Sequence, residues 1–209
     1  MTAGGRAGSA APGAEADAIV LAGGRSARLG GVPKAALRYD GTTLLRRTVD
    51  AVGWARRIVV VGDAGGQELP DGVLLTREEP AFAGPAAAIA AGMRLLADPA
   101  PFVLVLACDL PRVDLLVPVL RSALEGEGFP GHDGAVAVDE GRLQPLTAVY
   151  RSESLLAAVE SKSRELVGCS VFGLISELRL LAVDPPEGAA RDVDTWTDAA
   201  AFGIVRPTE

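Results

Sequence analysis

The chain has 209 residues, of which 49% are hydrophobic and 4% aromatic, and its formal net charge is −7. This length fits a single domain with a core built mostly from Val, Leu, Ile and Ala. The acidic balance argues against nonspecific binding of nucleic acid, because such binding needs a basic face that neutralises phosphates.

The first 16 residues are rich in Ala and Gly and lack the continuous apolar core of a secretion signal. No run in the chain approaches the roughly 20 apolar residues that cross a bilayer. We therefore expect residues 1–16 to be a disordered leader and residues 17–205 to form one domain without a membrane contact. Cys108 and Cys169 are far apart and form no metal or redox pair, which favours a reducing, cytoplasmic location.

Apolar runs alternate with helical segments along the chain. In the first half we expect strands at 18–21, 57–61, 73–75 and 101–107, and helices at 44–52, 86–96 and 115–124. In the second half we expect strands at 135–138, 146–150 and 179–183, and helices at 154–160 and after Thr195 or Thr197. Strands that are apolar throughout predict a single Rossmann-like α/β domain of three layers. Its central sheet should be mostly parallel and covered by helices on both faces.

The glycine-rich segment 22–34 directly follows the first expected strand. Glycines let successive backbone N–H groups turn toward a ligand, and such turns form a concave anion site. The segment matches neither the Gly-x-x-x-x-Gly-Lys-Ser/Thr phosphate loop nor the Gly-x-Gly-x-x-Gly dinucleotide pattern. A flexible connection is the plain alternative. Residues 18–39 nevertheless carry four cations and no acidic residue, which favours a nucleoside triphosphate as ligand; these cations are Arg25, Arg28, Lys34 and Arg38.

Asp109 follows the apolar run 101–107. Ligands of such sheets bind at the carboxyl ends of the strands, so Asp109 and the glycine-rich segment should converge on one site. A turn or a helix N-cap is the alternative role for this aspartate. A phosphate loop at the same edge favours a magnesium ligand, since Mg²⁺ is bound by a few carboxylates together with substrate phosphates.

Asp192 and Asp194 precede the last expected helix. In an extended segment, residues two apart point to the same side. One carboxylate could bind the metal while the other caps the helix, although ordinary capping chemistry would also explain the pattern.

The chain resembles the molybdenum cofactor guanylyltransferases and the nucleotidyltransferases related to them. Five elements appear in the same order: Leu-Ala-Gly-Gly-x-Ser-x-Arg-Leu-Gly at 21–30 followed by Lys34, Gly84-Pro85, Cys-Asp-x-Pro at 108–111, Pro-Leu-x-Ala-Val-Tyr at 145–150 and Asp-x-Asp-Thr at 192–195. The resemblance spans residues 17–202. Arg77 stands where that family usually has an aspartate, so the choice of base stays open.

The resemblance implies transfer of GMP from GTP to molybdenum-molybdopterin, with Mg²⁺ as cofactor and pyrophosphate as by-product. It implies catalytic roles for Lys34, Arg28 and Asp109, and metal binding by Asp109 and Asp194. The expected nucleotide site comprises Leu21, Ala22, Gly23, Gly24, Arg25, Ser26, Arg28, Lys34, Gly84 and Asp109. The expected acceptor site comprises Gln144, Pro145 and Asp192. Transient contacts with other proteins of molybdenum cofactor biosynthesis, or with acceptor proteins, are a further implication.

Two alternative functions remain at this point. One is a cytidylyl- or other nucleotidyltransferase that acts on molybdopterin or on a sugar or alcohol phosphate. The other is a nucleotide-binding module without catalytic activity. Lys34, Asp109 and Asp194 together argue against the module, because pure binding needs no metal carboxylates.

Overall fold

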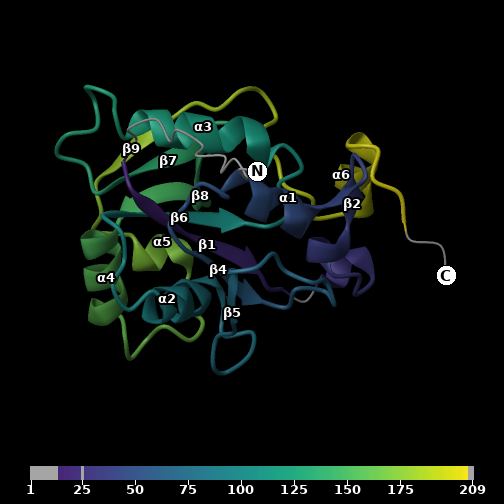
Figure 1. Cartoon of the computed structure of the whole chain (residues 1–209), viewed down its shortest axis with the longest axis horizontal. Coiled ribbons are helices and arrows are strands. Elements are labelled where there is room, and N and C mark those ends of the chain that lie inside the picture. Colours follow the sequence, from purple (N-terminus) through teal and green to yellow (C-terminus); the bar gives the residue numbers. More distant parts are fainter. Residues whose placement is uncertain (1–13, 25, 207–209) are drawn as a thin grey trace, which may run out of the picture.

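A seven-stranded sheet forms the centre of the protein (Figure 1). The computed structural model describes residues 14–24 and 26–206, so most of the expected leader and Arg25 lie outside the described residues. The strand order is β5-β4-β1-β6-β8-β7-β9. The strands are β1 (Ala16–Ala22), β4 (Ile58–Gly62), β5 (Leu74–Thr76), β6 (Phe102–Ala107), β7 (Gly134–Asp139), β8 (Arg142–Arg151) and β9 (Leu180–Val183).

β1 begins one residue earlier than the domain boundary expected from the sequence. Ala16 had been placed in the leader, but it is buried and lies opposite Phe102 in the β1–β6 pairing. Ala16 therefore belongs to β1, one residue before the expected start of the domain.

The sheet is mostly parallel, as the alternation of strands and helices predicts. β1 pairs in parallel with β4 and β6, β4 with β5, and β7 with β9. β8 runs antiparallel to both of its neighbours, β6 and β7. The two-residue turn between β7 and β8, Glu140-Gly141, has positive φ at both positions, as tight hairpins of this length favour. This turn starts β8 at Arg142, four residues before the expected strand.

Helices cover both faces of the sheet (Figure 1). On one face lie α2 (Pro85–Leu95), α4 (Ser152–Ser161) and α5 (Val171–Leu174), and on the other lie α1 (Leu44–Ala51) and α3 (Val113–Ala123). Successive side chains of β1 point to opposite faces of the sheet. Ile19 packs against α2 on one face, and Val20 belongs to the core formed with α1 and α3 on the other. α3 begins two residues earlier than expected, and α5 was not expected.

A small third cluster joins the glycine-rich segment to the C-terminal helix α6 (Trp196–Ala201). The segment contains two 3-10 turns, η1 (Ala27–Leu29) and η2 (Lys34–Ala36), and leads into the hairpin β2 (Arg38–Tyr39) and β3 (Thr42–Thr43). The buried members of the cluster are Leu29, Leu37, Leu44, Val193, Ala199 and Ile204. Thr195 is the N-cap of α6 and forms a capping box with Asp198, in which each side chain bonds to the backbone N–H of the other residue. Of the two expected caps, Thr195 and Thr197, the structure therefore uses Thr195. No helix among the described residues is long and apolar enough to cross a membrane.

Candidate active site

The segment between β1 and η2 forms an open loop at the carboxyl edge of the sheet. Gly23 and Gly24 are exposed, and Gly24 has a φ of +133°. Two hydrogen bonds to the Ser26 carbonyl turn the loop: the carbonyl accepts from the Leu29 N–H at 2.9 Å and from the Gly31 N–H at 3.1 Å. This geometry leaves backbone N–H groups available for an anion. Arg25, expected in this loop, lies outside the described residues.

Lys34 stands at the centre of an ion-pair cluster. Its Nζ donates to Asp109 Oδ2 at 2.7 Å and also to Asp194 Oδ1. Arg28 Nη1 donates to Asp194 Oδ2 at 3.2 Å. Burial alone would lower the pKa of Lys34, but the two carboxylates outweigh burial and raise that pKa above its ordinary value. Lys34 is therefore a fixed positive charge at neutral pH.

Three carboxylates gather beside Lys34. One oxygen from each of Asp109, Asp192 and Asp194 lies within 4.8 Å of the others. Asp109 Oδ1 is buried and has no hydrogen-bond partner among the described residues. Burial, followed by the charges of Asp109 and Asp194, raises the pKa of the Asp192 carboxyl. A set of converging carboxylate oxygens, one of them unpaired, fits a hard cation such as Mg²⁺.

Asp109 does not cap a helix. The N-cap of α3 is Arg112, and α3 itself begins only at Val113. The Asp109 backbone carbonyl accepts from the Val193 N–H at 3.0 Å, which ties the 192–194 segment to the end of β6. This bond explains how carboxylates far apart in the sequence meet. Asp109 and Asp194, the two metal ligands that the family resemblance implies, lie together in this cluster, and Asp192 lies with them.

Two adjoining cavities lie over the glycine-rich loop, with volumes of about 400 Å³ and 290 Å³. Both are lined by Gly23, Gly24, Lys34, Glu78, Phe82 and Cys108. Of the other expected nucleotide-site residues, Ala22 and Ser26 line the larger cavity, and Leu21, Gly84 and Asp109 line the smaller one. Arg28 lines neither and reaches the site through Asp194.

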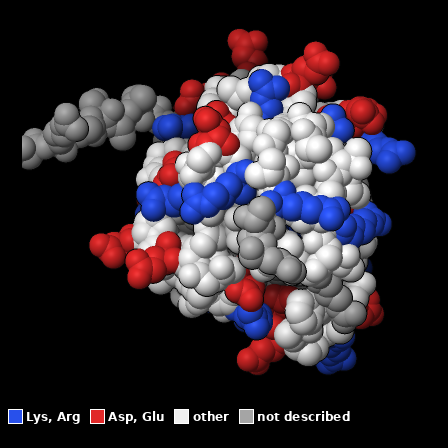
Figure 2. All heavy atoms as spheres, turned by 90° about the vertical axis from the view of Figure 1, so that its right-hand side faces the viewer, with Lys and Arg blue, Asp and Glu red and all other residues white. Residues whose placement is uncertain are grey.

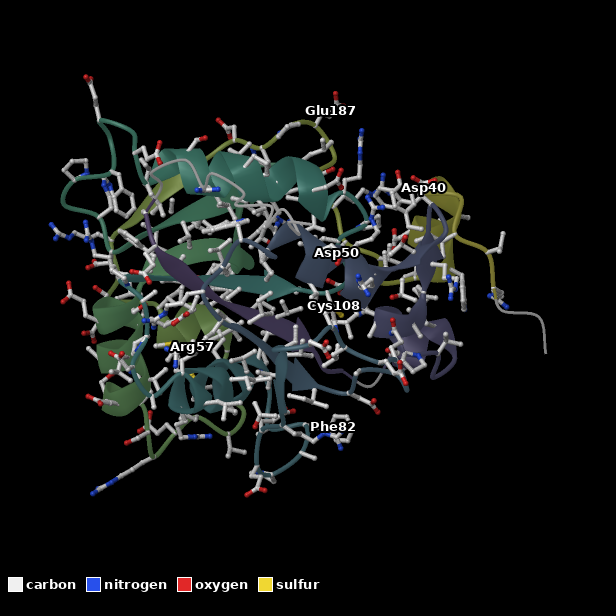
Figure 3. All side chains as sticks on the ribbon, in the orientation of Figure 1. Asp40, Asp50, Arg57, Phe82, Cys108 and Glu187 are labelled. Atoms are coloured by element: carbon white, nitrogen blue, oxygen red, sulfur yellow. The ribbon has the colours of Figure 1, made fainter. Side chains whose placement is uncertain are left out.

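The cavities lie where the parallel strands end. Figure 3 shows Cys108 and Phe82 toward the right-hand ends of the strands, with Arg57 toward the opposite ends. Figure 2 shows the right-hand side of Figure 1 face on, and Lys and Arg side chains cross the middle of that face. Arg77 also lines the larger cavity and lies 3.7 Å from the exposed Asp63 carboxylate.

A third cavity, of about 280 Å³, adjoins the carboxylate cluster. The three expected acceptor residues, Gln144, Pro145 and Asp192, all line it. Asp109 lines both this cavity and the smaller of the two cavities over the glycine-rich loop, so it stands between them. Phe172 also lines the third cavity and is 56% exposed. Phe172 cannot be singled out from the sequence, because it belongs to α5, whose four residues are too few to show a helical period.

A glycine-rich loop, an ammonium group and three carboxylates meet between these cavities, an arrangement that suits a nucleotidyltransferase. Comparison with known proteins agrees. Residues 18–172 match the family described as "MobA-like NTP transferase domain". The chain belongs to this family, which confirms the resemblance seen in its sequence and its assignment as an enzyme.

Individual relatives support the same assignment. A "Probable molybdenum cofactor guanylyltransferase" of Mycobacterium ulcerans is 36% identical over 175 residues, which cover 76% of this chain and 84% of that protein. A "Molybdenum cofactor guanylyltransferase" of Albidiferax ferrireducens is 30% identical over 169 residues, covering 71% and 75%.

Solved structures share the fold at low sequence identity. Molybdopterin-guanine dinucleotide biosynthesis protein A from Archaeoglobus fulgidus has a TM-score of 0.66 at 17% identity, with 89% of this chain and 96% of that chain covered. The 2-C-methyl-D-erythritol 4-phosphate cytidylyltransferase of Francisella tularensis has a TM-score of 0.70 at 13% identity, with 91% and 99% covered. These likenesses establish the α/β architecture, and the choice of base and acceptor depends on other evidence.

Proposed function

We propose that this nucleotidyltransferase moves GMP from GTP to the phosphate of molybdenum-molybdopterin in a Mg²⁺-dependent reaction. The products are the dinucleotide cofactor and pyrophosphate. The names of relatives up to 36% identical support the donor and the acceptor. The observation that carries the proposal is the position of Asp109, which stands between the nucleotide and acceptor cavities within a cluster of three carboxylates.

The three carboxylates of Asp109, Asp192 and Asp194 are the residues that would hold Mg²⁺. When bound, Mg²⁺ offsets negative charge on phosphate oxygens. The unpaired Asp109 Oδ1 supports this assignment, because a buried carboxylate oxygen without a partner is costly and a cation would satisfy it.

The reaction needs positioning and charge neutralisation by the protein. An oxygen of the acceptor phosphate attacks the α-phosphorus of GTP. The bond from the α-phosphorus to the oxygen that bridges to the β-phosphate breaks, and its electron pair leaves with pyrophosphate. The Gly23 and Gly24 N–H groups offer donors to the phosphates, while Lys34 exchanges its carboxylate partners for phosphate oxygens. Arg28 adds a second cation at the rim.

The acceptor cavity suits a planar, uncharged heterocycle. Phe172 offers an aromatic face, and Gln144 offers both amide donors and an acceptor. The described lining of this cavity contains no Lys or Arg. The positive charge beside the acceptor phosphate would therefore come from Lys34, which is paired with Asp109. A cytoplasmic location and transient contacts with other proteins of molybdenum cofactor biosynthesis belong to the same proposal.

Pyrophosphate release from a panel of GTP, CTP, ATP and UTP, with and without molybdopterin, tests the proposal. We expect release that needs GTP, Mg²⁺ and molybdopterin together. A preference for CTP would replace the guanylyl assignment with a cytidylyl one. Tight triphosphate binding without release, with any acceptor offered, would instead favour a binding module.

A further inference from the structure

Lys34 lies on a turn that is too short to hold its own shape. In η2 the Ala36 N–H donates to the Pro33 carbonyl at 3.0 Å, and the Leu37 N–H donates to the Lys34 carbonyl at 3.1 Å. Single 3-10 turns have poor hydrogen-bond geometry, and helical segments of a few residues are not stable by themselves in water. The position of the Lys34 ammonium therefore depends on the segments that hold η2.

The Gln67 side chain joins η2 to two other segments. Its Nε2 donates to the Ala35 carbonyl at 3.0 Å and to the Ala64 carbonyl at 2.9 Å. Its Oε1 accepts from the hydroxyl of Thr43, the N-cap residue of α1. Both amide donors and the amide oxygen are thus bonded, and they link η2 to the turn after β4 and to the start of α1.

The turn that carries Gln67 also packs against η2. A Cβ atom at Gly65 would lie 3.4 Å from the Ala36 Cβ, which is ordinary van der Waals contact. Ala35 is 2% exposed, and a buried carbonyl without a partner is costly, so the bond from Gln67 restricts where this carbonyl can lie. Gln67 lines neither of the two cavities over the glycine-rich loop. It would therefore act on a bound nucleotide only through η2.

We propose that Gln67 is a positioning residue for nucleotidyl transfer, because it fixes the turn that carries Lys34. The inference rests on the proposed function, in which the Lys34 ammonium offsets charge on the phosphates. A charged group is effective in catalysis when it is already in place as the transition state forms. A misplacement of about 1 Å can lower a rate by about 100-fold. Loss of the Gln67 amide frees η2 and places the ammonium less accurately.

A double-mutant cycle with Lys34→Ala tests this role. The measured quantity is the rate of pyrophosphate release at saturating molybdopterin and saturating triphosphate, with the triphosphate that the native protein prefers. Gln67→Met removes the amide at similar side-chain length and should lower the native rate at least about tenfold. In the Lys34→Ala background the same change should lower the rate by less than about twofold, because the group that Gln67 positions is already absent. Glu68→Gln, at the exposed next position, should leave the rate unchanged.

Circular dichroism at the assay temperature shows whether each variant is folded. Gln67→Asn keeps the amide on a shorter side chain, and it takes the place of Gln67→Met in the cycle if that variant does not fold. Equal losses in the two backgrounds, or unfolding of both variants, would mean that Gln67 only stabilises the fold and would overturn the inference. A native rate for Gln67→Met would overturn it too. These results leave the proposed function intact, whereas absence of pyrophosphate release by the native protein, with any triphosphate and acceptor, overturns both.

Discussion

Lys34 forms ion pairs with two of the three carboxylates of the site. Its ammonium bridges Asp109 and Asp194 in the free protein, where it balances part of the negative charge that would otherwise repel a triphosphate. In the proposed reaction this ammonium would offset the negative charge that develops on pyrophosphate. Loss of one such positioned charge typically costs about 2–4 kcal/mol of transition-state stabilisation.

Lys34→Ala should therefore lower the rate of pyrophosphate release by roughly two to three orders of magnitude. Circular dichroism should show that the variant stays folded at 25 °C. Arg46→Ala is a suitable control, since Arg46 pairs with Asp50 along α1 and contributes nothing to the site. A near-native rate for Lys34→Ala would mean that this lysine is merely a solvated loop residue.

Asp17 holds the opposite end of β1 and gives a prediction about pH. Its carboxylate accepts from the Ala100 N–H at 2.8 Å and from the guanidinium groups of Arg56 and Arg57 at 3.1 Å. Burial alone would raise the pKa of Asp17, but the hydrogen bonds from Arg56 and the Ala100 N–H outweigh burial and hold that pKa below its ordinary value.

A lowered pKa means that Asp17 stabilises the fold when it is ionised. This stabilisation is present above the unfolded-state pKa of about 3.9 and is lost as the pH falls through the folded-state value. Asp17→Asn should lower the free energy of unfolding by about 2 kcal/mol at pH 7. Urea unfolding at pH 7 and at pH 3 should show that the difference between native and variant shrinks in acid. An unchanged difference would contradict the ionised state of Asp17.

The end of β4 supports the glycine-rich loop through close backbone contact. Gly62 has a φ of +120°, and a Cβ atom there would lie 2.6 Å from the Gly23 nitrogen and 2.8 Å from the Ala22 carbonyl carbon. Both atoms belong to backbone, so a side chain at position 62 must displace the loop that carries the proposed phosphate donors.

Gly62→Ala should lower the free energy of unfolding by about 1–3 kcal/mol through this overlap and should weaken GTP binding at least tenfold. Gly72→Ala is the matched control: Gly72 also has a positive φ, at +83°, but has open space around its Cβ position. The control should show only the strain of the left-handed backbone, about 1–2 kcal/mol, with GTP affinity unchanged. Equal GTP affinities for the two variants would rule out the supporting role of β4.

Those elements that are long and apolar could be predicted from the sequence. β1, β4 and β6 are buried on both faces, so their continuous apolar runs identify them directly. β8 was placed too short because Arg142, Leu143 and Gln144 belong to a hairpin whose register depends on the turn before it. The reversed direction of β8 depends on pairing between distant strands, which periodicity does not encode.

At the scale of the whole molecule, the site is assembled from segments that tertiary pairing brings together. The convergence of the glycine-rich loop and Asp109 at one edge could be predicted, because parallel strands share their carboxyl ends. That both Asp192 and Asp194 lie beside Asp109 could not, because it depends on the hydrogen bond from the Val193 N–H to the Asp109 carbonyl.

We propose that Asp109 joins the nucleotide and acceptor cavities as a magnesium ligand. The most direct test of this proposal is Mg²⁺-dependent pyrophosphate release from GTP and molybdopterin by Asp109→Asn, with Asp114→Asn on α3 as the control. We expect a loss of about 1,000-fold, equivalent to about 4 kcal/mol, together with loss of the Mg²⁺ dependence of GTP binding. The melting temperature of the metal-free variant should stay within a few degrees of the native value, and Asp114→Asn should be fully active. If Asp109→Asn retains most of its activity, Asp109 is not a magnesium ligand and the proposed metal site is wrong.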